Sequence, residues 1–144
     1  MERNAGVLAI DHGEKRTGFA VADALRIAAN PLPGWRGPGG EAGLLGHIEE
    51  LLTQRSVSVL LVGLPLNMDG SDGPRTSAVR AFAARLAARF PELEIVLYDE
   101  RLTTKAAEEL MRESGVPRSK RKEQRDSASA LVLLRDWIAS GEPR

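Results

Sequence analysis

The spacing of the apolar segments constrains the fold of this chain more than any other feature of the sequence. Two short apolar segments, 6–10 and 18–22, are separated by a turn that contains glycine and several charged residues. Such a short gap favours an antiparallel hairpin, because a parallel crossover needs a dozen or more residues. We predict a third, weaker strand over 26–30 and a loop over 31–40, where three prolines and four glycines occur.

Helical and strand patterns alternate through the rest of the chain. Apolar residues at spacings of three and four predict helices over 41–55 and after Pro74. Continuous apolar segments predict buried strands over 57–62 and 94–98. Two more helices are expected, one starting at Thr103 or Thr104 and one over 123–140. These elements together predict an α/β fold with a mixed sheet and helices on its faces.

Length and composition exclude several classes of protein. A chain of 144 residues is typical of a single domain, so we expect one domain over 1–144. With 42% hydrophobic and 28% charged residues, it is neither mainly disordered nor a rod. The 20 basic and 20 acidic residues cancel, so any attraction to nucleic acid must be local. The absence of cysteine and the presence of only two histidines argue against a zinc site and leave oxygen ligands for any metal.

The sequence carries no sign of export or of a membrane anchor. Its start lacks the apolar region of a signal peptide, and no segment approaches the roughly 20 apolar residues of a membrane span. We therefore expect a cytoplasmic protein without a membrane partner.

Three acidic residues are candidates for a catalytic site. Asp11 ends the first strand, Glu100 follows the last strand, and Asp126 lies in the first turn of the expected final helix. Ligands usually bind outside the carboxyl ends of the strands in such a sheet. Carboxylates that meet there suit Mg²⁺ or Mn²⁺, and two such ions about 4 Å apart would hold the attacking water and leaving oxygen of a phosphodiester.

Each acid also has a purely structural interpretation. Asp126 gains from the helix dipole in a first turn, and Glu100 is equally compatible with a loop position or an ion pair with Arg101. Asp11 is compatible with ordinary turn chemistry. Gly63 either lets the backbone approach a substrate closely or is a turn residue. His47 lies on the polar side of its helix and is expected to be exposed.

Basic residues cluster at one place in the chain. The segment 117–125 has five cations and one acid, which suits phosphate binding but equally describes a solvated loop. Lys15 and Arg16, in the turn after Asp11, are further candidates for holding a phosphate.

Four sequence blocks together resemble the YqgF family, also called the RuvX or Holliday junction resolvase family. They are the D-x-G-x-x-R-x-G-x-A frame within 8–23, VGLPLNMDGS at 62–71, YDERLTT at 98–104 and DSASALVLL at 126–134. The second and third blocks, in that order, are highly specific. The resemblance covers nearly the full length of the chain.

The resemblance implies a single RNase H-like nuclease domain with a five-stranded mixed sheet in the order 3-2-1-4-5. It also implies an acidic cluster of Asp11, Glu100 and Asp126 that binds Mg²⁺ or Mn²⁺, with two ions expected. Phosphate-binding side chains are then expected at Lys15, Arg16, Arg101, Lys105, Lys120, Arg121 and Lys122.

The function that the resemblance implies is a metal-dependent nuclease of structured nucleic acid that processes the 5′ end of precursor 16S ribosomal RNA. The ribosome or its precursor is then a candidate partner. Two alternatives stay open: a Holliday junction resolvase in DNA recombination and repair, and a non-catalytic nucleic-acid-binding factor in ribosome assembly. The sequence leaves open whether the protein is a monomer or a homodimer.

Overall fold

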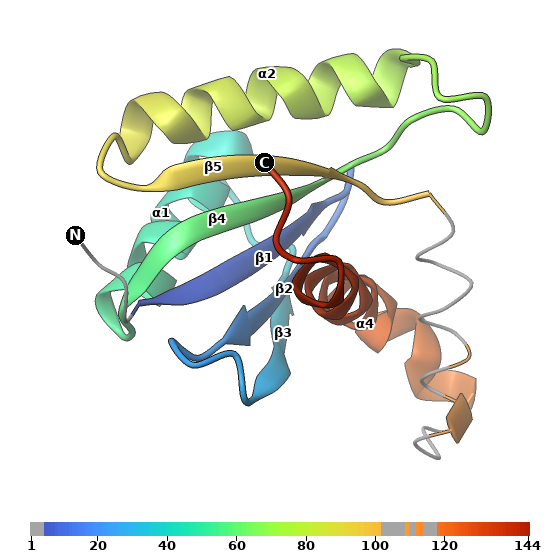
Figure 1. The fold of residues 1–144 in the computed structure, drawn as a ribbon. Coiled ribbons are helices and arrows are strands. Elements are labelled where there is room, and N and C mark those ends of the chain that lie inside the picture. The colour runs from blue at the N-terminus through green and yellow to red at the C-terminus, as the bar shows by residue number, and fades with distance from the viewer. Residues whose placement is uncertain (1–4, 102–108, 110–111, 114–117) are drawn as a thin grey trace.

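A five-stranded mixed sheet forms the centre of the molecule (Figure 1), in the order β3-β2-β1-β4-β5. The computed structural model describes residues 5–101, 109, 112, 113 and 118–144, and only the backbone of 118–126. The strands are β1 (Gly6–His12), β2 (Thr17–Ala22), β3 (Ala29–Trp35), β4 (Val57–Leu64) and β5 (Glu94–Asp99). Antiparallel pairing joins β1 to β2 and β2 to β3, whereas β1, β4 and β5 are parallel. The mixed sheet and its strand order are therefore confirmed.

Helices cover both faces of this sheet. The helices α1 (Gly40–Thr53) and α2 (Pro74–Arg89) pack on one face, and α4 (Arg118–Ala139) packs on the other (Figure 1). Side chains of a strand alternate between the two faces. Accordingly Leu8 and Ile10 of β1 join the α1–α2 core, whereas Val7 and Ala9 join the α4 core. The same alternation places residue 12 on the α1–α2 side and residue 11 on the α4 side.

The third strand differs from the prediction. Strand β3 runs over 29–35, so the predicted strand over 26–30 is shifted and the predicted loop contains five strand residues. Its prolines, Pro31 and Pro33, are tolerated because β3 is an edge strand, where a ring nitrogen can face away from the sheet. The turn before it is closed by Asp23, whose side chain accepts a hydrogen bond from the amide of Ala28 at 2.8 Å.

The final helix also begins earlier than predicted. Because α4 starts at Arg118, residues 118–125 of the basic segment lie on a helix and not in a loop. Lys, Arg, Glu and Gln are good helix formers, which explains why the segment extends the helix. Asp126 then lies beyond the first turn, so the helix-dipole interpretation of this residue is wrong. The helix predicted from Thr103 or Thr104 falls largely outside the described residues.

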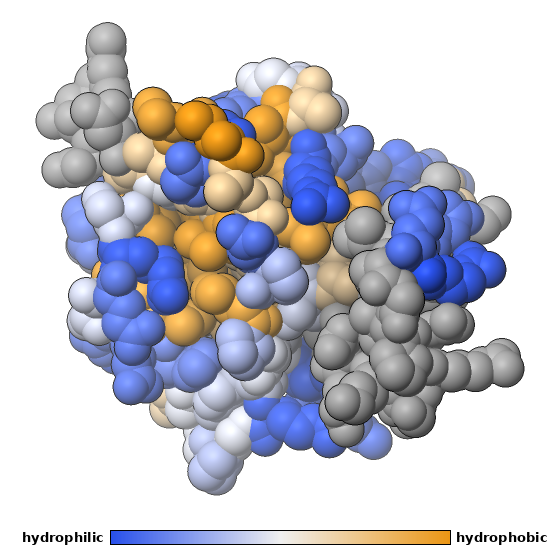
Figure 2. Space-filling model, turned by 90° about the horizontal axis from the view of Figure 1, so that it is seen from below, coloured by the Kyte–Doolittle hydropathy of each residue, from blue (hydrophilic) through white to orange (hydrophobic). Residues whose placement is uncertain are grey.

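Apolar side chains also reach the surface of the molecule. Figure 2 shows the face seen from below, where apolar residues gather among polar ones. On the connection between β2 and β3, Leu25 is 71% exposed and Ile27 is 80% exposed. Among the described helices, none combines the length and the apolar character needed to cross a membrane.

Candidate active site

Two of the predicted acids meet at one edge of the sheet. Asp11 lies on β1 and Glu100 directly follows β5, while β4 runs between these two strands. Because the three strands are parallel, their carboxyl ends converge. The amide of Glu100 donates a hydrogen bond to the carbonyl of Leu64 at 3.1 Å, which continues the pairing of β5 with β4. The carboxyl groups of Asp11 and Glu100 are hydrogen-bonded to each other.

Gly63 makes room for the Glu100 side chain. It lies on β4 between the two acids, and a Cβ atom built there would be only 2.5 Å from Oε2 of Glu100. The same Cβ would lie 3.2 Å from Cδ2 of Leu133 on α4. The turn interpretation of Gly63 is wrong, because this glycine is a strand residue whose missing side chain accommodates Glu100. A close approach of substrate to its backbone stays a prediction.

The electrostatics of this pair favour a cation. Burial raises the pKa of Glu100, an effect that the hydrogen bond with Asp11 and the positive charge of Arg75 partly offset. A hydrogen bond between two carboxyl groups requires a shared proton, and a divalent cation can take the place of that proton. Paired carboxylate oxygens are the donor set that Mg²⁺ and Mn²⁺ prefer. Among the described side chains, no group of three potential metal ligands occurs.

The third predicted acid can be placed only by its backbone. Asp126 lies on α4, and its side chain is outside the described residues. The next residue, Ser127, is buried and donates a hydrogen bond from Oγ to the carbonyl of Leu32 at 2.6 Å. This bond fixes α4 against β3 immediately after Asp126.

The side chains of most predicted phosphate-binding residues lie outside the described part of the structure. Lys120, Arg121 and Lys122 belong to α4 but their side chains are not described, and Lys105 lies wholly outside the described residues. Arg101 pairs with Asp99, with 2.7 Å between Nη2 and Oδ2. Its Nη1 also donates to the carbonyl of Met68 at 3.1 Å, so Arg101 joins the end of β5 to the loop after β4.

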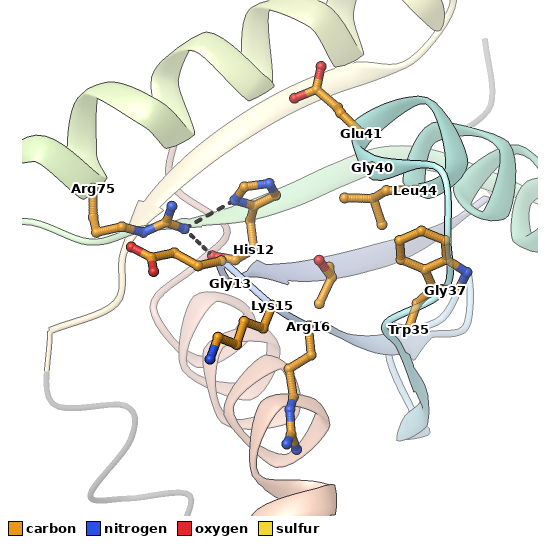
Figure 3. Close-up of a pocket in the computed structure, with 12 residues that line it drawn as sticks. His12, Gly13, Lys15, Arg16, Trp35, Gly37, Gly40, Glu41, Leu44 and Arg75 are labelled. Carbon is orange, nitrogen blue, oxygen red and sulfur yellow. Dashed lines mark hydrogen bonds between the residues drawn. The ribbon is translucent and has the colours of Figure 1, made fainter.

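A cavity lies beside the turn between β1 and β2 (Figure 3). It has a volume of about 380 Å³, and its lining includes Lys15, Arg16, Trp35 and Arg75. Nη2 of Arg75 donates to the carbonyl of His12 at 2.8 Å and lies 3.2 Å from Nδ1 of the same residue. Lys15 and Arg16 were expected from the sequence, whereas Trp35 and Arg75 were not. The one available signal was a tryptophan within a segment otherwise rich in proline and glycine.

Both histidines of the chain pack close to this cavity. The ring of His12 stacks on Phe82 with 4.2 Å between centroids, and burial followed by the charge of Arg75 lowers its pKa. His47 is half-buried, in contrast to the expected exposure, and its ring contacts both Phe19 and Trp35. Burial also lowers the pKa of His47.

Comparison with known protein families assigns the chain to one of them. The family model RuvX, described as Holliday junction resolvase, matches residues 5–140. The chain belongs to the RuvX family.

Relatives of this RuvX chain carry a different name. A Halalkalibacterium halodurans protein named "Putative pre-16S rRNA nuclease" is 41% identical over 132 residues, which cover 91% of this chain and 94% of that protein. An Escherichia coli protein of the same name is 39% identical over 135 residues, covering 94% of this chain and 96% of that protein.

Solved structures confirm the fold of the RuvX chain. Thermus thermophilus RuvC in complex with a Holliday junction substrate matches with a TM-score of 0.59 and 17% identity, covering 96% of this chain and 97% of that one. A second structure of Thermus thermophilus RuvC matches with a TM-score of 0.55 and 15% identity, covering 95% and 97%. The expected RNase H-like fold is therefore confirmed.

Proposed function

We propose that this RuvX chain is a divalent-metal-dependent nuclease of structured nucleic acid, and that its substrate is the 5′ end of precursor 16S ribosomal RNA. The hydrogen-bonded pair of Asp11 and Glu100 at the carboxyl edge of the sheet is the observation that carries the proposal. Membership of the resolvase family and the names of its relatives make the chain a phosphodiester-hydrolysing enzyme. The metal, the ribosomal substrate and the site residues are our proposal.

Each part of the site has a role in this proposal. Asp11, Glu100 and Asp126 would hold Mg²⁺ or Mn²⁺, with two ions expected, and the metal would supply an activated water and offset charge on the phosphate. Burial shields the carboxyl group of Glu100 from solvent, which strengthens its attraction to a cation. The cations predicted from the sequence would bind backbone phosphates and orient the strand. A cytoplasmic location and a ribosomal partner stay predictions.

The junction resolvase is the second candidate, because both the family description and the likeness to RuvC favour it. A resolvase cuts two symmetric strands and therefore needs a dimer with two sites. A non-catalytic binding factor would instead bind nucleic acid in a strongly salt-dependent way without turnover.

A cleavage assay on matched substrates tests these candidates. Precursor 16S ribosomal RNA, single-stranded RNA, a four-way DNA junction and duplex DNA are incubated with the protein in Mg²⁺, in Mn²⁺ and in EDTA. Asp11→Asn is the test variant, and Asp72→Asn is the matched control, since Asp72 is exposed and pairs with Arg80 on α2.

The proposal expects metal-dependent cutting of the precursor RNA that Asp11→Asn abolishes and Asp72→Asn leaves intact. Selective cutting of the junction would replace it with the resolvase. Salt-sensitive binding with no cutting under either metal, also with the ribosomal precursor particle as substrate, would favour the binding factor. Cutting that survives Asp11→Asn would show that the metal centre is assigned to the wrong residues.

A further inference from the structure

We infer that the cavity beside the β1–β2 turn binds unpaired nucleotides of the substrate strand. The inference rests on the proposed function in that it takes nucleic acid as the substrate, and it adds a requirement for single-stranded character next to the acid pair. Four properties of the cavity support it: its position, its charge, its aromatic wall and a second hollow that shares part of its lining.

The position of the cavity connects it to the acid pair. His12 lines the cavity on the α1–α2 side, whereas Asp11, the preceding residue, belongs to the α4 side of the same strand end. Arg75, at the start of α2, links the two sides. It hydrogen-bonds to His12 and also interacts electrostatically with Glu100. A nucleic-acid strand with a phosphate at Asp11 and Glu100 can therefore continue past the carboxyl ends of the β-strands into the cavity.

The charges of the lining suit a phosphodiester backbone. Lys15, Arg16 and Arg75 contribute three cations, and Figure 3 shows them on the side of the cavity away from Leu44. Of the two acids in the lining, Glu41 is ion-paired with Arg85 of α2, which offsets its charge. Guanidinium and ammonium groups are the usual partners of phosphate oxygens.

The opposite wall suits a nucleobase. Trp35 and Leu44 lie across the cavity from Arg75 (Figure 3). The sheet positions this indole through an irregularity, since Thr17 pairs with Trp35 while Phe19 pairs with Leu32, and such bulges re-aim side chains. Bases contact aromatic walls of this kind only when they leave the base stack. A volume of 380 Å³ lies within the roughly 300–1,000 Å³ of small-molecule sites, which a single nucleotide suits.

A second hollow shares two lining residues with the first. It has a volume of about 240 Å³ and is lined by Arg16, Gly34, Trp35 and Arg36. Arg16 and Trp35 thus belong to both hollows. Two adjacent hollows that share a cation and an aromatic ring fit consecutive nucleotides of one strand. A base inside a duplex stays in its stack and cannot enter either hollow.

Binding measured without metal tests this inference separately from catalysis. In EDTA, fluorescence anisotropy is used to compare a labelled single-stranded RNA with a fully paired RNA hairpin of the same composition. Arg75→Gln and Trp35→Leu are the test variants. Arg80→Gln is the control, because Arg80 lies on the same helix, pairs with Asp72 and lines neither hollow.

We expect the wild-type protein to prefer the single strand, and both test variants to weaken that binding about 5-fold or more. Trp35→Leu should do so because it removes the ring on which a base stacks, and Arg75→Gln because it removes a cation that binds phosphate. The control should stay within twofold. Intrinsic fluorescence supplies a second readout that needs no variant, since Trp137 is fully buried in the α4 core and Trp35 lines the cavity.

Equal binding of hairpin and single strand would overturn the inference, as would unchanged binding by both variants or an unchanged tryptophan signal on saturation. A protein that binds single strands in this way but cleaves nothing would lose the proposed function and keep this site. A protein that cleaves but shows none of these binding effects would lose only this site.

Discussion

The Glu100 carboxyl group rests against the backbone of Gly63, so closely that a Cβ atom on residue 63 would lie 2.5 Å from Oε2. The candidate site thus depends on a residue with no side chain. Three neighbouring strands contribute to it: β1 carries Asp11, β4 carries Gly63, and Glu100 follows β5.

Gly63→Ala is expected to displace Glu100, because the end of the side chain gives way more easily than the strand. Cleavage should fall by about 10²-fold, as it does when a catalytic group is misplaced by about 1 Å. The free energy of unfolding should fall by about 1–3 kcal/mol because of crowding against Leu133. Cleavage rates and urea unfolding measure the two effects.

Gly46→Ala is the matched control for this substitution. Gly46 lies within α1, is exposed and has open space where a Cβ would be. The change should stabilise the protein by about 0.5–1 kcal/mol and leave cleavage unchanged. Full activity of Gly63→Ala would show that the position of Glu100 against this glycine does not matter for function.

Asp11→Asn should affect stability in opposite ways with and without metal. In EDTA the amide of Asn can donate a hydrogen bond to Glu100 without a shared proton, so the variant should be at least as stable as the wild type. Saturating Mn²⁺ should stabilise only the wild type, by about 2.7 kcal/mol at one hundred times the dissociation constant. Thermal unfolding measures the stability in EDTA and in Mn²⁺. An equal effect of Mn²⁺ on the two proteins would contradict the proposal that Asp11 binds the metal.

His47 should make the protein less stable in mild acid. Its folded pKa is lowered by burial, so the unfolded state binds the proton more readily as the pH falls below about 6.5. The stability that the neutral ring contributes is present above that pH and is lost as the pH falls through the folded pKa. Nε2 of His47 is buried and has no hydrogen-bond partner among the described side chains, so a proton on this atom would lack an acceptor in the folded state.

The variant His47→Phe isolates the contribution of this histidine. The free energy of unfolding, measured in urea from pH 7.5 to pH 5, should depend less on pH than in the wild type. The remaining dependence includes His12, whose pKa is lowered too. An unchanged pH profile would mean that His47 titrates normally in the folded protein.

Arg26 should hold the C-terminal residues against the β2–β3 turn. Its Nε pairs with Oε2 of Glu142 at 3.0 Å, and its Nη1 donates to the carbonyl of Ala5 at 3.0 Å. Arg26 also adopts a left-handed backbone conformation, with φ 60°. Arg26→Ala should cost about 1.5–3 kcal/mol, the usual range for hydrogen bonds of a charged group.

Arg26→Gly removes the same side chain but tolerates this backbone conformation. It should therefore be less destabilising than Arg26→Ala by about 1 kcal/mol. Urea unfolding of the pair separates the side-chain contacts from the backbone strain. A glycine variant less stable than the alanine variant would contradict this account.

Much of the sheet could be predicted because local patterns determine it. The short turn after β1 favours a hairpin, and the alternation of apolar segments with amphipathic helices favours parallel crossovers. Strand β3 was misplaced because Pro31 and Pro33 usually indicate a loop, and only the strand order shows that they lie at an edge. The start of α4 was missed because its first residues are charged and show no apolar periodicity.

Local sequence patterns indicate some residues of the candidate site and not others. The sequence makes Asp11 and Glu100 candidates for one site, because each lies at or just after the carboxyl end of a strand, but it is equally compatible with separate structural roles for the two acids. The roles of Gly63, Trp35 and Arg75 could not be predicted, because each acts through a contact with a residue distant in the sequence. Such contacts depend on strand register and helix packing, which local patterns do not determine.

The two prolines of β3 also limit how copies of this protein can associate. Pro31 and Pro33 leave two positions of this edge strand without an N–H group, and the pairing of β3 with β2 is irregular next to Pro33. Both features oppose the pairing of a second molecule at this edge, which would extend the sheet into a continuous ten-stranded one. If two copies work on symmetric strands, we expect them to meet through other surfaces, and the spacing of their active sites follows from those surfaces.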